Sequence, residues 1–130
     1  MSISGACLCG RCVYETAAEP INVRACHCHK CQRATGAPVY ARVLVALDTV
    51  TMSGPIGWYP SSPDLRRGFC QICGTTLFSE RASANAIGLA MGSLNHPERF
   101  APTMHIWTAS KQPWVEIGAG VAQFEQAAPG

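Results

Sequence analysis

The sequence predicts a mainly β fold with little helix, built from short antiparallel strands in bent sheets. Proline and glycine recur at short intervals along the chain and leave little room for long helices. The segments between them are short and rich in β-branched and aromatic side chains, as strands are. Cysteines at 7–12, 26–31 and 70–73 form three tight groups, a pattern typical of metal-binding domains.

Eight segments have the composition expected of strands. They are 12–15 (CVYE), 38–46 (PVYARVLVA), 49–54 (TVTMSG), 57–60 (GWYP), 75–80 (TTLFSE), 86–94 (AIGLAMGSL), 104–109 (MHIWTA) and 114–118 (WVEIG). Their regular spacing favours a sandwich or bent sheets. The one helix-like segment follows Cys28 and should end at Gly36 after one or two turns.

Length and composition favour one domain spanning residues 1–130. The chain has 130 residues, of which 48% are hydrophobic, enough for a single ordinary core. Its first ten residues resemble no secretion signal, and no apolar run is long enough to cross a membrane. We therefore expect a cytoplasmic protein that does not contact membranes. In that reducing compartment, eight cysteines are expected to bind metal rather than form disulfides.

The charge of the chain does not indicate nucleic-acid binding. The formal net charge is +2 with all thiols neutral. Ligating cysteines lose their protons, so seven thiolates with two Zn²⁺ ions would change this charge to about −1. Arg66 and Arg67 form the longest run of basic residues, too short for the multiple phosphate contacts that nucleic acid requires.

Two of the cysteine groups share a feature that favours one closed zinc site. Glycine follows the second cysteine both in "CLCG" (7–10) and in "CQICG" (70–74). Glycine adopts the positive φ that turns backbone amides toward ligand sulfurs. Zinc commonly takes two ligands from each of two tight turns. We expect a structural zinc site formed by Cys7, Cys9, Cys70 and Cys73.

Cys12 is left over from this assignment, and three roles are open to it. Strand alternation places it on one face with Tyr14, where a lone cysteine is usually a small buried apolar residue. It could instead replace Cys7 by forming a C-x2-C pair with Cys9. It could also supply a fourth ligand to the second cysteine group, which would close that site.

The second group, Cys26, Cys28 and Cys31, has no obvious fourth sulfur. Three protein ligands and an open position are the pattern of a catalytic or exchangeable zinc. His29 is the alternative fourth ligand, whereas His27 is expected to be exposed or hydrogen-bonded. Three thiolates make the metal electron-rich, which suits a soft ligand such as an incoming thiol. The expected reaction is addition of a thiol to a small electrophile such as an aldehyde.

Five motifs in this order resemble one known family. They are "GACLCGRCVYE", "CHCHKCQRATGAP", "RRGFCQICGTTL", "GSLNHP" and "HIWTASKQPWVEI", running from Gly5 to Ile117. Together they resemble the glutathione-dependent formaldehyde-activating enzymes, also called the centromere protein V family. The resemblance implies a β-tent fold with two zinc sites. It also implies a carbon–sulfur lyase activity that joins glutathione and formaldehyde to S-hydroxymethylglutathione.

Matched motif by motif, the resemblance gives each cysteine group a role. It implies a structural zinc at Cys7, Cys9, Cys70 and Cys73 and a catalytic, weakly held zinc at Cys26, Cys28 and Cys31. Glutathione carries carboxylates, and the cations expected to bind them are Arg66, Arg67 and Arg33. Cys12 replaces the small apolar residue common in the family. The alternative function is a noncatalytic zinc module in protein–protein interaction, and the oligomeric state stays open.

Overall fold

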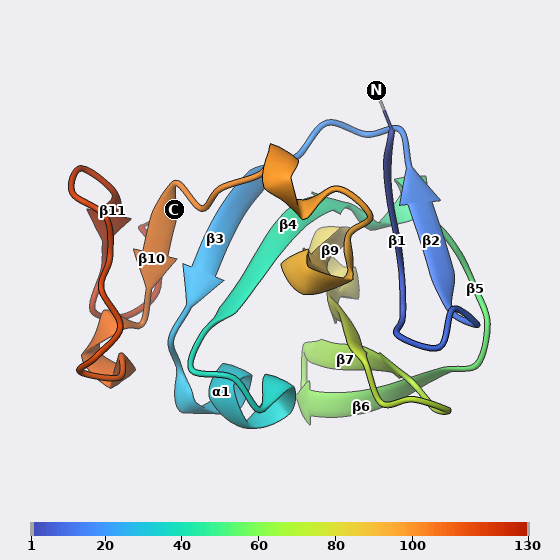
Figure 1. Ribbon diagram of the computed structural model, residues 1–130, viewed down its shortest axis with the longest axis horizontal. Helices are drawn as coiled ribbons and strands as arrows, with labels where there is room; N and C mark the ends of the chain where they lie inside the picture. The colour runs from blue at the N-terminus through green and yellow to red at the C-terminus, as the bar shows by residue number, and fades with distance from the viewer. Residues whose placement is uncertain (1, 130) are drawn as a thin grey trace.

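The computed structural model describes residues 2–129 and arranges them in two β-sheets (Figure 1). The smaller sheet is antiparallel and has the order β1-β2-β5. The larger sheet has the order β11-β10-β3-β4-β9-β8-β7-β6. The strands are β1 (Ile3–Ala6), β2 (Val13–Thr16), β3 (Asn22–Cys26), β4 (Tyr40–Ala46), β5 (Thr51–Ser53), β6 (Ile56–Ser62), β7 (Leu65–Cys70), β8 (Thr76–Arg81), β9 (Ala86–Ala90), β10 (Met104–Ile106) and β11 (Ala122–Gln123).

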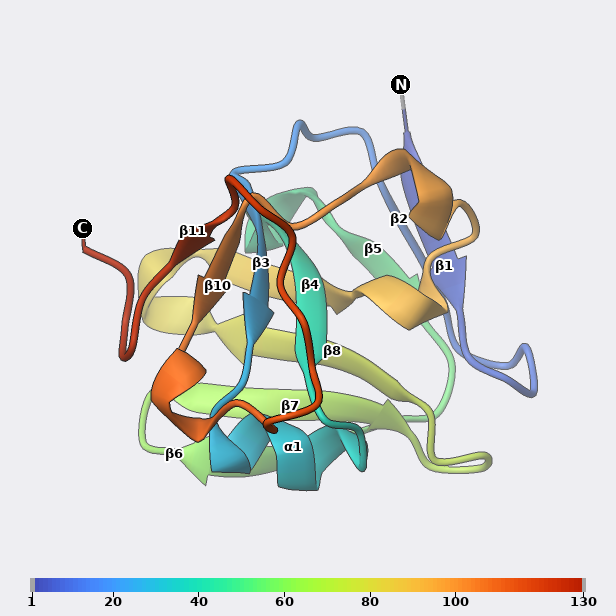
Figure 2. The same cartoon turned by 60° about the vertical axis from the view of Figure 1, so that its left-hand side comes forward.

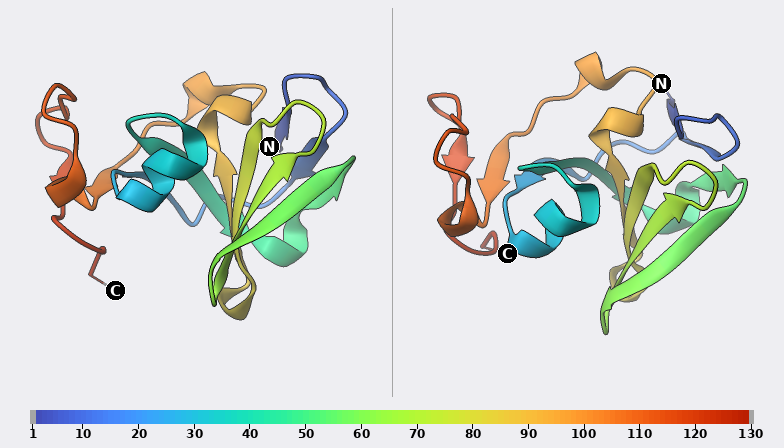
Figure 3. Two further views of the ribbon diagram at one scale, coloured as in Figure 1. Left: turned by 90° about the horizontal axis from the view of Figure 1, so that it is seen from below. Right: turned by 60° about the horizontal axis from the view of Figure 1, so that its bottom comes forward.

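The larger sheet is strongly bent. In Figure 2, β3 and β4 run across the direction of β6, β7 and β8. The register shifts between Pro60 and Ser62 in the β6–β7 pair and between Gly68 and Phe69 in the β7–β8 pair. Such irregularities bend a strand and increase its twist. The bend leaves a space that is filled by α1 (His29–Thr35), which lies between the β10–β11 edge and strands β6–β8 in both views of Figure 3.

The predicted mainly β fold with little helix is confirmed. The α-helix of the described residues, α1, begins after Cys28 and ends at Gly36, as predicted. Gly36 has φ +68° and donates its N–H to Gln32 O at 2.8 Å, a common helix ending. Short 3₁₀ turns connect several strands, at Leu47–Thr49, Ala82–Ala84, Met91–Ser93, Pro97–Arg99 and Thr108–Ser110. The larger sheet is mixed at one edge, because β10 runs parallel to β3 and to β11.

Strands form in every predicted segment except 114–118. That prediction is wrong, because turn hydrogen bonds occupy the backbone groups that strand pairing would need. The Val115 N–H donates to Gln112 O at 3.1 Å, and Lys111 Nζ donates to Val115 O at 2.7 Å. Four strands, β1, β3, β7 and β11, were not predicted. β1 and β11 are short, whereas β3 and β7 contain arginines, Arg24 in β3 and an adjacent pair in β7, which interrupt the apolar pattern.

The hydrophobic core lies between the two sheets. Alternation in β2 matches the prediction: Cys12 and Tyr14 are buried, whereas Val13 and Glu15 are exposed. The central strand β9 is buried along its whole length. Further core residues are Ile3, Val43, Val45, Leu77, Phe78, Ile87, Leu89 and Leu94. Within residues 2–129, no helix has both the length and the apolar character needed to cross a membrane.

Close packing around Gly5, where the two sheets meet, predicts that a larger side chain at this position destabilises the protein. Gly5 is bridged to Leu94, and a Cβ there would overlap the Tyr14 ring and lie 2.5 Å from Ser93 O. Gly5→Ala should lower the free energy of unfolding by about 1–3 kcal/mol, the usual cost of overpacking. Urea denaturation measures this change.

Gly92→Ala is the matched control for this substitution. No heavy atom lies within 4 Å of a Cβ added at Gly92, so its stability should stay within about 0.5 kcal/mol of wild type. Equal stability of the two variants would contradict the tight junction described here.

Candidate metal centres

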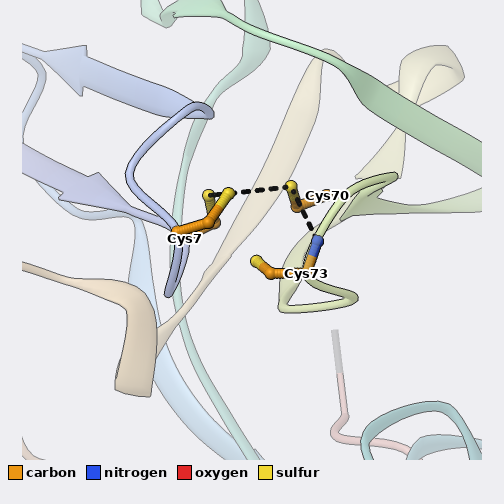
Figure 4. Close-up of side chains that lie close together, drawn as sticks. Cys7, Cys70 and Cys73 are labelled. Atoms are coloured by element: carbon orange, nitrogen blue, oxygen red, sulfur yellow. Dashed lines mark hydrogen bonds between the residues drawn. The ribbon is translucent and has the colours of Figure 1, made fainter.

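Four cysteine sulfurs from two turns meet where the smaller sheet approaches the larger one. Cys7 and Cys9 lie in the turn between β1 and β2, and Cys70 and Cys73 lie at the turn between β7 and β8 (Figure 4). All four Sγ atoms lie within 4.8 Å of one another. The Sγ of Cys9 is 3.5 Å from that of Cys7 and 3.8 Å from that of Cys70. Four sulfurs so placed are a donor set that fits tetrahedral zinc.

Backbone amides point at these sulfurs because of two glycines. Gly10 and Gly74 have φ of +81° and +79°. Their N–H groups close the turns onto the carbonyls of Cys7 and Cys70 at 3.1 and 2.9 Å. The Cys12 N–H then donates to Cys7 Sγ at 3.2 Å. Burial opposes a charge on Cys7, yet this amide and the neighbouring thiols together lower the pKa of Cys7.

Cys12 is a core residue rather than a ligand. Its side chain is fully buried and packs in one cluster with Cys7 and Cys70. Burial raises the pKa of Cys12 to about 12. The four-sulfur group is complete without Cys12, and the second cysteine group packs in a separate cluster. The structure therefore favours the first of the three roles considered for Cys12.

The second group consists of Cys26, Cys28 and Cys31, whose Sγ atoms also lie within 4.8 Å of one another. Cys26 ends β3, Cys28 caps α1 and Cys31 lies in the first turn of that helix. Cys28 Sγ accepts the Cys31 N–H at 3.3 Å, which fixes the start of the helix. Cys31 is buried, whereas the other two are partly exposed. Between residues 2 and 129, no fourth cysteine, histidine or carboxylate joins this group.

Arg67 reaches this group from β7. Its Nη2 donates to Cys31 Sγ at 3.6 Å, and its side chain is buried. Hydrogen bonds from Cys26 and from Arg67 lower the pKa of Cys31 to about 5, against the opposing effect of burial. Cys31 is thus a thiolate at neutral pH, the form that binds metal. The three sulfurs together are a donor set that fits zinc with a position left for an exchangeable ligand.

The histidines near this group form a buried pair instead of ligands. His27 is fully buried, and its Nε2 lies 2.8 Å from His105 Nδ1. Burial lowers the pKa of both histidines, so the pair is neutral at pH 7 and one ring donates to the other. His27 therefore has the predicted hydrogen bond without being exposed. His29 is exposed and lies outside the three-sulfur group.

The three arginines expected to bind substrate lie in different surroundings. Adjacent strand residues point to opposite faces, so Arg66 and Arg67 separate. Arg66 Nε donates to Glu80 Oε1 at 2.6 Å, and its guanidinium lies 4.0 Å from the centre of the Trp58 ring. Arg66 thus has partners on the face away from the second cysteine group, whereas Arg67 contacts that group. Arg33 is exposed on α1.

Arg33 lies at an open hollow of about 430 Å³ on the outer side of α1. The hollow is also lined by His29, Gln32, Gln112 and Trp114. Gln112 Nε2 donates to Gln32 Oε1 at 2.8 Å, which attaches the C-terminal segment to the helix. Trp114 is 71% exposed, so this rim presents an aromatic surface to solvent.

Sequence analysis missed several polar residues near the second group. Tyr40 is paired with Cys26 in the sheet, and its hydroxyl lies 2.9 Å from Ser79 Oγ. Arg42 Nη1 donates to Asn22 Oδ1 at 2.7 Å. Alternation in the predicted strand 38–46 already put Tyr40 and Arg42 on one face. Only the pairing of β3 with β4 shows that this face carries Cys26.

Comparison with known proteins agrees with this arrangement. A family model described as "Glutathione-dependent formaldehyde-activating enzyme" matches residues 2–110. An uncharacterized lyase of Schizosaccharomyces pombe is 32% identical over 74 residues. That match covers 57% of this chain and 54% of the relative, so the chain spans about half the length of this curated relative.

A solved structure supports the fold alone. A crystal structure of a Rhodobacter sphaeroides protein matches with a TM-score of 0.57 and 23% sequence identity. The match covers 71% of this chain and 87% of that one. At this identity the likeness shows a shared fold and carries no information about activity.

The buried position of Cys12 predicts that Cys12→Ala leaves metal binding intact. Zinc content and the thiolate-to-metal absorption of the cobalt-loaded protein should match wild type, because no sulfur ligand is removed. Stability should fall by about 1 kcal/mol from the small cavity. Cys70→Ala is the contrasting variant and should lose one metal ion. A weaker thiolate band in Cys12→Ala would show that Cys12 is a ligand.

The Arg67–Cys31 hydrogen bond predicts that Arg67→Gln weakens metal binding at the second group alone. Loss of this partner should lower the affinity of that group about tenfold, as is usual for residues that orient ligands. The affinity is measured by competition with a chelator, in which the zinc released from the protein is recorded. Arg66→Gln is the control because it lies on the other face. Equal weakening in both variants would contradict a specific role for Arg67.

Proposed function

The chain belongs to the family of glutathione-dependent formaldehyde-activating enzymes, and on this premise we propose that it is a zinc-dependent carbon–sulfur lyase-type enzyme. Its substrates are thiol adducts of small aldehydes. The specific reaction proposed is the joining of glutathione and formaldehyde to S-hydroxymethylglutathione, and its reversal. Glutathione is thus the proposed thiol partner.

The observation that carries this proposal is that the two cysteine groups contain different numbers of sulfurs. Cys7, Cys9, Cys70 and Cys73 offer four sulfurs, a complete set for a structural zinc. Cys26, Cys28 and Cys31 offer three, and two of these are partly exposed. A three-sulfur site next to solvent leaves room for the sulfur of a substrate. This difference supports one structural and one catalytic site.

The proposed chemistry follows from the donor set of the second group. Zinc held by Cys26, Cys28 and Cys31 would lower the pKa of an incoming thiol. Arg67 keeps Cys31 in its thiolate form through the Nη2–Sγ hydrogen bond. The buried His27–His105 pair fixes the end of β3 against β10 and keeps the two cysteines beside His27 in place.

The addition of glutathione to formaldehyde needs no further reactant. The glutathione sulfur forms a bond to the aldehyde carbon, the C=O bond becomes a C–O single bond, and the thiol proton ends on that oxygen. In the reverse direction the same C–S bond breaks, and the hydroxyl proton returns to the sulfur. No oxidant or reductant takes part.

Exchange spectroscopy by NMR tests the activity, because glutathione and formaldehyde also combine spontaneously. The zinc-loaded protein should accelerate exchange between free glutathione and its hydroxymethyl adduct. Cys28→Ser should abolish this acceleration, since it removes one of three ligands.

Cys12→Ala is the matched cysteine control and should retain the acceleration. If wild-type protein at high concentration gives no acceleration with both metal sites filled, the proposed activity is wrong. A noncatalytic zinc module would then be the better description.

A further inference from the structure

Two further arginines lie on the face of the larger sheet that carries the second cysteine group. Arg24 in β3 is paired directly with Arg42 in β4. Arg24 precedes Cys26 by two residues, so strand alternation puts both side chains on the same face. Arg67 joins this face through its hydrogen bond to Cys31. Arg24, Arg42 and Arg67 therefore lie on the face of the sheet that carries the three sulfurs.

Within the described residues, Arg24 and Arg42 lack the carboxylate partners that the molecule gives to other arginines. Arg24 Nε and Arg67 Nε are buried and have no hydrogen-bond partner in the structure of residues 2–129. Arg42 has one neutral partner, the side-chain oxygen of Asn22 at 2.7 Å. No ion pair with a described carboxylate includes Arg24, Arg42 or Arg67. Arg24 and Arg42 are partly buried, and a guanidinium removed from water without an anionic partner is unfavourable in free energy.

Paired arginines elsewhere in the same sheet show the contrast. Arg66 binds Glu80 at 2.6 Å, and Arg81 binds Asp64 at 3.1 Å. Arg24 and Arg42 instead lie directly opposite each other, an arrangement in which like charges destabilise a sheet. Burial and the nearby Arg24 charge lower the pKa of Arg42. Such unfavourable arrangements are typical of functional sites, where a ligand supplies the missing partner.

Gly88 in β9 is what lets Arg42 lie along this face. A Cβ at Gly88 would be 2.5 Å from Arg42 Cδ and would also overlap Ser79 Oγ. The Arg42 side chain therefore lies directly over the backbone of β9, beside Ser79. The site is thus a fixed arrangement near the sulfurs and not a pair of mobile surface arginines.

We propose that Arg24 and Arg42 bind carboxylate groups of the thiol substrate while its sulfur lies at Cys26, Cys28 and Cys31. This inference rests on the proposed function and adds the residues that select the substrate. A guanidinium matches a carboxylate through two parallel hydrogen bonds, and glutathione carries two carboxylates. Selection is therefore for acidic thiols over neutral thiols of equal size.

Binding of S-methylglutathione tests this site without a free thiol. This probe keeps both carboxylates, and its dimethyl ester keeps the shape without the charges. In calorimetry with the zinc-loaded protein, S-methylglutathione should bind and the ester should bind at least about tenfold more weakly. Arg42→Gln and Arg24→Gln should each weaken binding of the acid by about tenfold.

Arg99→Gln is the control for the change in charge, because Arg99 is exposed in the turn Pro97–Arg99. It should bind S-methylglutathione like wild type. Equal affinity for the acid and the ester overturns the proposal, and so does undetectable binding of the acid. The comparison of acid with ester uses wild-type protein, so it holds even where a variant fails to fold.

The two proposals fail in different ways. If exchange spectroscopy shows no acceleration but S-methylglutathione binds in an arginine-dependent way, the activity is wrong and the carboxylate site stands. If the acceleration is present and the ester of glutathione reacts as well as the acid, the activity stands and the carboxylate site is wrong.

Discussion

Two cysteine turns meet at the junction of the two sheets and bring their four sulfurs together there. Cys7 and Cys9 belong to the smaller sheet, whereas Cys70 and Cys73 belong to the bent end of the larger one. Their contact fixes how the two sheets approach each other and thereby encloses the core between them. A metal ion shared by four sulfurs would add on the order of 10 kcal/mol to folding.

The bend of the larger sheet also determines what surrounds the second cysteine group. Because β7 crosses the direction of β3, Arg67 can reach Cys31, although the two residues are far apart in the chain. The opposite face of the larger sheet packs mainly into the apolar core and also carries the Arg66–Glu80 ion pair. One sheet therefore serves two purposes: a buried face that stabilises the fold and a polar face that gathers sulfurs and guanidinium groups. Burial of apolar side chains on one face stabilises the fold. This stabilisation offsets the repulsion between the arginines on the other face.

Much of the fold was predictable because it depends on local patterns. Alternation in 12–15 placed Cys12 and Tyr14 in the core, and Gly36 gave the end of the helix. The prediction failed where polar residues serve the site instead of the core. Arginines interrupt the apolar pattern of β3 and β7, and of these Arg24 and Arg67 belong to the face that carries the second cysteine group. The segment 114–118 failed for the opposite reason: its composition suits a strand, but its backbone is held in a turn.

The grouping of the cysteines follows from local sequence, because the two glycines after them adopt positive φ and mark the turns that carry the ligands. The mainly β class likewise follows from the short spacing of proline and glycine. In contrast, the place of Cys12 in the core and the divergence of Arg66 and Arg67 follow from how the strands pack. Only the tertiary structure brought Arg24 and Arg42 together on the face that carries the second group. Strand pairing joins residues far apart in the chain, and local spacing does not specify which strands become neighbours.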